Sequence, residues 1–221
     1  YNVAIGRQAL KENVGGDYNT GVGLNAGTNI GHGTSNTQYS TVIGSDAGEY
    51  ATGSYNTFVG AKAGEGGITS APFNSGQNNT AIGYQALTGF TTAPGNTAVG
   101  RSALGAVTTG DYNTAVGYNA GDALTSGYTN VAIGYEALGN DSQGRSTVAI
   151  GQTAAHLQSL GNVDSYNTVI GAAASYQNQV GLHNTIVGAQ AGNKATGSYN
   201  TFVGSLAGKG GTTSAPFSSG Q

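Results

Sequence analysis

The chain contains no cysteine, methionine or tryptophan, and only 8% of its residues are charged. Without cysteine it cannot form disulfide bonds or a thiolate metal site. The net charge is −3 and lysine and arginine form no stripe, which argues against a nucleic-acid partner. No apolar run approaches the roughly 20 residues that a membrane-spanning helix needs. These absences exclude several classes of protein and leave the fold open.

Glycine is abundant instead, at 40 of the 221 residues. A disordered chain rich in glycine would have few β-branched residues and many charges. Here Val, Ile and Thr recur at regular intervals. The sequence therefore predicts an ordered fold in which glycines mark the corners.

Variants of one phrase, Asn-Thr-small-(Val/Ile)-Gly with Ala three residues after the glycine, occur twelve times, as in 113–117 and Ala120. The glycines that end the phrase are most often 17 residues apart, with insertions of up to six residues. A unit this short does not hold a pair of packed helices, but it suits one turn of a β-solenoid. The fold class we predict is all-β: a parallel β-solenoid, or β-roll, of about twelve stacked coils.

The residue before each of these glycines is Val or Ile, and two residues earlier lies Thr or Val. Side chains alternate along a strand, so these two positions share one face. We expect this face to lie inside the coil. The predicted core ladder consists of Ile5, Val22, Ile43, Val59, Ile82, Val99, Val116, Ile133, Ile150, Ile170, Val187 and Val203.

The middle residue of the phrase points the opposite way and is never polar. Strands that are covered on both faces read as continuous apolar runs. Identical neighbours around an axis are the simplest cover, so we expect a homotrimer; a single thick solenoid with a broad core is the alternative. The predicted subunit interface consists of Ala4, Val42, Phe58, Ala81, Ala98, Ala115, Ala132, Ala149, Val169, Ile186 and Phe202.

Asn opens the phrase in ten of the twelve copies, and Tyr often precedes it, as at Tyr18, Tyr55 and Tyr112. Asn side chains satisfy turn backbone and also form ladders between stacked strands. The tyrosines predict a row of rings stacked along the outside of the coils. A structural ladder is the favoured interpretation, and a carbohydrate-binding platform is the alternative.

A second, longer repeat lies on the first. Residues 51–77 return at 195–221 with 22 of 27 positions identical, at an offset of 144 residues. We therefore interpret 1–221 as a single β-solenoid repeat region, a window from a longer fibre. The block carries the longest insertion, and loops on a rigid scaffold often bind partners. The candidate receptor loops carry Pro72, Phe73, Pro216 and Phe217, with decoration that binds nothing as the alternative.

The chain shows no pattern typical of catalysis. His32, His156 and His183 fall at different phases of the repeat, without acidic or cysteine partners at ligand spacing. His183 takes a position that Tyr holds elsewhere, which favours stacking. Nucleophile-elbow, phosphate-loop and paired-carboxylate patterns are missing. We expect no catalytic residue, no metal, no cofactor and no enzyme activity.

The phrases NTAVGYNAG (113–121), NVAIGYEAL (130–138) and NTAIGYQAL (79–87) resemble a known repeat. They are similar to the head repeats of trimeric autotransporter adhesins, and still more to the NTAVGYQAL repeats of phage tail fibres and related bacterial surface proteins. The resemblance covers nearly the whole chain. It implies left-handed parallel β-rolls wound as a homotrimer about an apolar axis, although the adhesin unit is shorter and more regular.

These features predict a non-enzymatic structural fibre protein, a shaft or head segment of a trimeric phage tail fibre or surface adhesin used for host or surface attachment. The expected location is extracellular, on a virion tail fibre or a cell surface. The expected partners are further copies of the chain and a cell-surface glycan or protein receptor, with no nucleic acid and no membrane span. Alternatives are an extracellular filament or matrix polymer, or a glycan- or ice-binding solenoid, which would need an exposed Thr or aromatic array.

Overall fold

The computed structural model describes residues 1–32, 36–67 and 74–210. The chain divides into two compact units, Tyr1–Tyr112 and Asn113–Gln221. Within the described ranges all named elements are three-residue strands. A helix long and apolar enough to cross a bilayer is absent from the same ranges.

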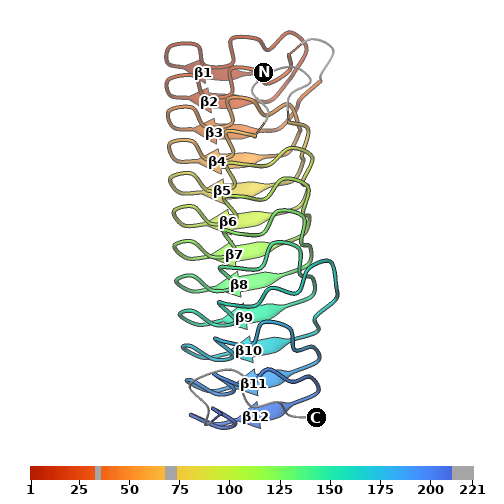
Figure 1. Ribbon diagram of the computed structural model, residues 1–221. Helices are drawn as coiled ribbons and strands as arrows, with labels where there is room; N and C mark the ends of the chain where they lie inside the picture. The colour runs from red at the N-terminus through yellow and green to blue at the C-terminus, as the bar shows by residue number, and fades with distance from the viewer. Residues whose placement is uncertain (33–35, 68–73, 211–221) are drawn as a thin grey trace. The chain divides into compact units, whose positions relative to one another are not determined.

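The first unit contains six parallel strands, each paired with the next along the chain (Figure 1). They are β1 (Val3–Ile5), β2 (Thr20–Val22), β3 (Thr41–Ile43), β4 (Thr57–Val59), β5 (Thr80–Ile82) and β6 (Thr97–Val99). Equivalent positions of the phrase pair with one another, as Thr80 does with Thr97. Each repeat is therefore one coil of a β-solenoid.

The second unit repeats this arrangement with β7 (Thr114–Val116), β8 (Val131–Ile133), β9 (Val148–Ile150), β10 (Thr168–Ile170), β11 (Thr185–Val187) and β12 (Thr201–Val203). Its strands are also parallel and follow chain order. The predicted all-β parallel solenoid with one strand per phrase is confirmed.

Backbone hydrogen bonds join each coil to both neighbours. The N–H of Thr80 donates to the carbonyl of Asn96 at 2.8 Å, and the N–H of Gly83 donates to the carbonyl of Val59 at 2.8 Å. The first bond reaches the following coil and the second the preceding one. A single coil cannot satisfy its own backbone, so stability arises between coils.

The structure reverses the predicted inside and outside of the strands. The predicted core ladder points outward, and all twelve of its residues are half-buried or exposed: Ile5, Val22, Ile43, Val59, Ile82, Val99, Val116, Ile133, Ile150, Ile170, Val187 and Val203. The middle residues point into the chain's own coil. Nine of the predicted interface residues are buried there: Val42, Phe58, Ala81, Ala98, Ala115, Ala132, Ala149, Val169 and Ile186.

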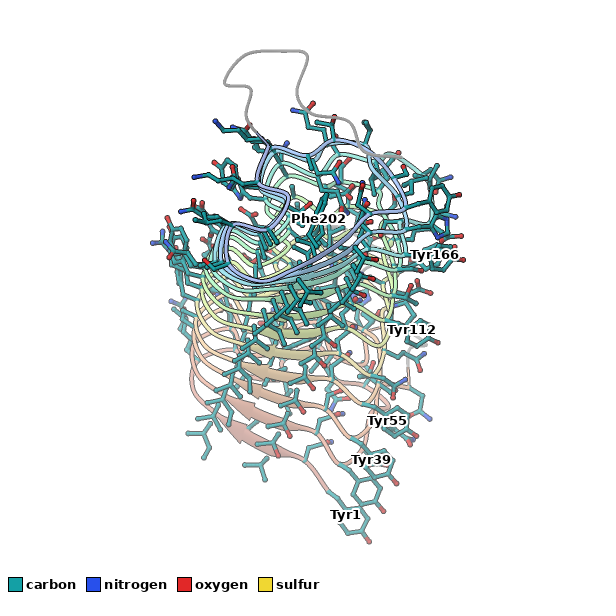
Figure 2. All side chains as sticks on the ribbon, turned by 90° about the horizontal axis from the view of Figure 1, so that it is seen from below. Tyr1, Tyr39, Tyr55, Tyr112, Tyr166 and Phe202 are labelled. Carbon is teal, nitrogen blue, oxygen red and sulfur yellow. The ribbon has the colours of Figure 1, made fainter. Side chains whose placement is uncertain are left out.

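Ala4 and Phe202 occupy the same middle position in β1 and β12, where they are exposed and half-buried respectively. Phe202 points into the interior of its coil (Figure 2). The middle position is therefore apolar because it lines the coil interior. A subunit interface at these residues was a wrong prediction.

The interior of each coil is narrow. The middle residue of the strand and the residue six positions later face each other across it, and their side-chain volumes are complementary. A Cβ built on Gly64 would lie 2.5 Å from ring atoms of Phe58, and one built on Gly192 would lie 3.0 Å from Cδ1 of Ile186. Four of the six coils with Ala at the middle position instead carry Leu six residues later, as in Ala81 and Leu87. In these coils a large side chain at one position faces a small one at the other.

The glycine that ends each phrase permits the close stacking of coils. Gly83 has a φ of +132°, and a Cβ placed there would lie 2.7 Å from the carbonyl oxygen of Gly100. Both the backbone conformation and the available space therefore require glycine. The same positive φ and close approach to the next coil recur at Gly6, Gly23, Gly44, Gly60, Gly117, Gly134, Gly151, Gly171 and Gly188.

Asn side chains form a buried row next to the strands. Asn79 Nδ2 donates to the carbonyl of Ala93 at 2.9 Å, and its Oδ1 accepts from the N–H of Asn96 at 2.8 Å. Asn130 and Asn167 make the same pair of bonds with their following coils. The predicted Asn ladder is thus present and fixes the turn that enters each strand.

Candidate interaction surface

Within each unit the outward side chains of the strands form one surface, which we call the strand face. In the first unit it consists of Thr20, Thr41, Thr57, Thr80 and Thr97 beside Val22, Ile43, Val59, Ile82 and Val99. The rows are in register from strand to strand. Ile82 remains 41% exposed although coils lie on both sides of it.

The second unit has an equivalent strand face with two valines in the threonine row. Its rows are Thr114, Val131, Val148, Thr168, Thr185 and Thr201, beside Val116, Ile133, Ile150, Ile170, Val187 and Val203. All of these side chains are half-buried or exposed. The β-branched shape suits a pleated surface, and none of the described residues covers these uncharged rows of methyl and hydroxyl groups.

Several ionisable groups lie in the turns that follow the strands. Lys62 Nζ donates to Glu65 Oε1 at 3.0 Å, and this hydrogen bond raises the pKa of Lys62. Burial, and then the charge of Asp46, raises the pKa of Glu49. Burial also raises the pKa of Asp122 in the second unit. The strand face itself has no charged residue.

A column of rings, which we call the tyrosine ladder, lies one residue before the Asn row. It comprises Tyr1, Tyr18, Tyr39 and Tyr55 in the first unit. Ring centroids of successive members are 5.0, 4.8 and 5.5 Å apart, and the ring planes differ by 5°, 1° and 10°. Tyr1, Tyr39 and Tyr55 project from the same edge of the coils (Figure 2).

The predicted outer row of stacked rings is confirmed at these positions. The faces of the inner rings cover one another, so they present edges and hydroxyl groups to solvent. A sugar that packs on an aromatic ring needs a free ring face. The geometry therefore favours the structural interpretation of the ladder over the carbohydrate platform.

The histidines also stack. His183 lies between Tyr166 and Tyr199, with centroids 5.2 and 4.9 Å away, as its position in the repeat predicted. His156 stacks on Tyr176 at 5.4 Å, and its Nδ1 lies 3.0 Å from the carbonyl oxygen of Glu136. Among the described residues, no group of three or more His, Cys, Asp or Glu side chains could hold a metal ion.

One hollow of about 230 Å³ lies over the turns of the first unit, lined by Gln85, Thr88, Ser102 and Gly105. None of these four residues is a general acid or base near neutral pH. The candidate receptor residues Pro72, Phe73, Pro216 and Phe217 lie outside the described residues. Receptor binding at those loops stays a prediction.

The repeat phrase predicts the strands, the Asn row and the ring column. The strand face was not predicted from the sequence, because its side chains were expected inside the coil. Comparisons with protein-family models, with curated proteins and with solved structures each found no match for this chain.

Proposed function

We propose that this chain is a non-enzymatic structural segment of an extracellular fibre, of the tail-fibre or surface-adhesin kind, and that it works as a homotrimer joined through the strand face. The single observation that carries the proposal is the strand face itself: in-register, uncharged rows of half-exposed β-branched side chains. Host or surface attachment is the role that such a fibre would serve.

The use of polar side chains supports a structural role. The buried Asn side chains bond to the backbone of the next coil, as Asn113 does to the carbonyl of Gly127 at 2.8 Å. Tyr and His side chains stack on one another between coils. These groups are engaged in holding coils together, which is the task of a fibre segment.

The strand face is also suited to contact between copies of the chain. Exposed apolar patches of this regularity mark interaction sites, and an uncharged surface has no like-charge repulsion against a copy of itself. Val and Ile rows brought around a common axis would bury apolar surface at about 25 cal/mol per Å². Three copies is the number implied by the resemblance to adhesin heads and tail fibres.

Replacing Ile82 with Glu should prevent assembly while the coils stay folded. A carboxylate at the centre of an apolar interface would lose its hydration without gaining a partner. The measurement is the mass of the particle by sedimentation equilibrium. The unmodified chain should give about 65 kDa, three times its 21.8 kDa, and the variant should sediment as a monomer.

Ala81→Glu is the matched control, since this neighbouring residue on β5 is buried inside the coil. It should unfold its coil and lose circular dichroism, whereas Ile82→Glu should keep a native spectrum. A monomeric mass for the unmodified chain, or a native-mass trimer for Ile82→Glu, would contradict the proposed interface.

Ice binding is a second candidate function, favoured by one observation. Five threonines of the first unit lie in one outward row, beside a row of Val and Ile. Strands about 4.8 Å apart, with first and third residues roughly 6.6 Å apart, give a regular two-dimensional array. Such an array of hydroxyl and methyl groups is able to order water in a lattice.

A monomeric chain that slows ice recrystallisation would favour this second function. Thr80→Tyr should then abolish the effect, because a bulky ring would interrupt the flat row without adding charge. Gln85→Tyr, in the turn that follows the same strand, is the control and should leave ice growth inhibition unchanged. A trimer without effect on ice would exclude the candidate, because both functions use the same face.

A further inference from the structure

The tyrosine ladder offers a chemistry that the fibre role does not use. The rings of Tyr18, Tyr39 and Tyr55 are each about half exposed, at 46%, 50% and 52%. The rings of Tyr18 and Tyr39 are 4.8 Å apart and almost parallel, at 1°. The two rings therefore lie face to face in adjacent coils.

We propose that the tyrosine ladder is a site of oxidative cross-linking, at which a one-electron oxidant of the peroxidase class joins Tyr18 to Tyr39 through a carbon–carbon bond between their rings. The exposed ring edges give the oxidant access to the hydroxyl groups. A radical formed on either residue meets another tyrosine in the adjacent coil before it meets another chain.

The backbone holds the partners in place. Tyr18, Tyr39 and Tyr55 have φ values of 59°, 55° and 63°, so each enters the ladder with the same left-handed conformation. The N–H of Tyr39 donates to the carbonyl of Asp17 at 3.2 Å, and that of Tyr55 donates to the carbonyl of Gln38 at 2.9 Å. The coil stack thus fixes the two Cα atoms, while the exposed rings keep the freedom to turn and close the bond.

The reaction balances with hydrogen peroxide as the terminal oxidant. Each tyrosine loses one electron and its hydroxyl proton, which gives two phenoxyl radicals. The radicals couple at the ring carbons next to oxygen, and the hydrogen on each of these carbons moves to oxygen and restores the two phenols. The two electrons and two protons removed convert one hydrogen peroxide molecule into two water molecules.

The bond would fasten one coil covalently to the next. Residues 18 and 39 are 21 positions apart, so the cross-link closes a loop of 21 residues. Closing such a loop restricts the unfolded chain and raises stability, as a disulfide does. This chain has no cysteine with which to form a disulfide. A tyrosine cross-link would provide a covalent bond between coils in place of a disulfide.

The second unit contains a natural comparison. His183 separates Tyr166 from Tyr199 in the same column, with centroids 5.2 and 4.9 Å from each. The two tyrosines are therefore two coils apart and out of reach of one another.

Tyr112 of the first unit, at 63% exposure, provides a second comparison. A Cβ built on Gly95, its predecessor in the column, would lie 2.7 Å from its Cδ1, so its ring lies over a glycine.

The experiment treats the full chain with a peroxidase and hydrogen peroxide, then maps cross-linked peptides by mass spectrometry. We expect a single-chain product that has lost two hydrogen atoms per bond and joins Tyr18 to Tyr39. Tyr39→Phe, which keeps the stack, should remove the links to Tyr18 and Tyr55 with an unchanged circular dichroism spectrum. Tyr112→Phe should leave the yield unchanged.

A gain of function provides the sharper test. H183Y places three tyrosines in successive coils, and it should create new links to Tyr166 and Tyr199 that the unmodified chain lacks. The cross-linked chain should also melt at a higher temperature than the untreated one. The proposal fails if ladder tyrosines form no link, if chains unfolded in urea give the same yield and pairing, or if H183Y adds none.

Discussion

Replacing Phe58 with Ala is expected to lower the free energy of unfolding by about 3–5 kcal/mol. The Phe58 side chain is fully buried, and its ring centroid lies 5.6 Å from that of Phe90 inside the first unit. Neighbouring coils are held by backbone bonds and cannot collapse into the space left behind. Urea denaturation at unchanged slope measures the loss. Ala61→Ser, at an exposed position just after the same strand and outside the strand face, is the control and should cost less than about 1 kcal/mol.

The same coil offers a compensating change. Gly64→Leu alone should destabilise by about 1–3 kcal/mol or more, because even a Cβ there would lie 2.5 Å from the Phe58 ring. The double variant Phe58→Ala, Gly64→Leu recreates the pair that the next coil carries in Ala81 and Leu87. Leu87 has a φ of 51°, close to the 55° of Gly64, so the backbone accepts leucine.

The double variant should therefore be more stable than either single variant. The expected coupling between the two sites is about 2 kcal/mol or more, within the range seen for residues in contact. Strictly additive losses would contradict the complementarity of the two positions. The comparison tests the coil interior directly, because neither residue belongs to the strand face.

The repeat phrase was sufficient to predict the strands and their parallel order. Each strand coincides with the three residues before a phrase-ending glycine, as β5 does with Gly83. Twelve copies of one phrase require twelve equivalent environments, and stacking provides them. The Asn row and the ring column followed from the same repetition, since identical side chains in register meet their own kind.

The repeat phrase does not determine which side chains of a strand face the coil interior. Alternation shows that Thr80 and Ile82 share a face, but it does not show which face is inside. A three-residue strand with one inward side chain and two outward ones places most of its β-branched residues outside. The deciding signal was the pairing of middle residues with the position six residues later: Val42 with Gly48, Phe58 with Gly64, Ala98 with Leu104.

The turns were beyond local sequence rules. Gln85 and Leu87 both adopt left-handed backbone, with φ values of 56° and 51°. This conformation costs roughly 1–2 kcal/mol for residues other than glycine. It is offset by hydrogen bonds to neighbouring coils, such as Leu87 N–H to the carbonyl of Ala103 at 2.9 Å. Those bonds exist only in the stack, so residue preferences alone do not predict them.

Replacing Asn79 with Ala is expected to destabilise the protein by about 2–6 kcal/mol, because two buried backbone groups lose their partners at roughly 1–3 kcal/mol each. The carbonyl of Ala93 loses the donor Nδ2, and the N–H of Asn96 loses the acceptor Oδ1. Asn79 is fully buried, so water does not replace the lost amide readily. Thermal and urea unfolding measure the effect.

Two companion variants distinguish the effect of the lost hydrogen bonds from the effect of the lost side-chain volume. Asn79→Ser should give an intermediate loss, because the chain itself places Ser40 in this row and its Oγ accepts from the N–H of Asn56 at 3.2 Å. Asn78→Gly changes an exposed residue whose φ of 59° suits glycine, and it should have little effect. Equal stability of Asn79→Ala and Asn78→Gly would contradict a structural role for the row.

The position at which amide hydrogen exchange rises distinguishes a ladder of coupled coils from a set of independent turns. Each Asn bonds forward to the next coil, so Asn79→Ala should increase amide hydrogen exchange at Asn96, 17 residues further along the chain. Coils contact only their neighbours, so the loss of protection should decline with distance along the stack. Exchange that rises only at residues 78–80 would mean that each turn is stable by itself. The stacked backbone geometry predicts the opposite, because the carbonyl and the N–H left without partners both belong to the following coil.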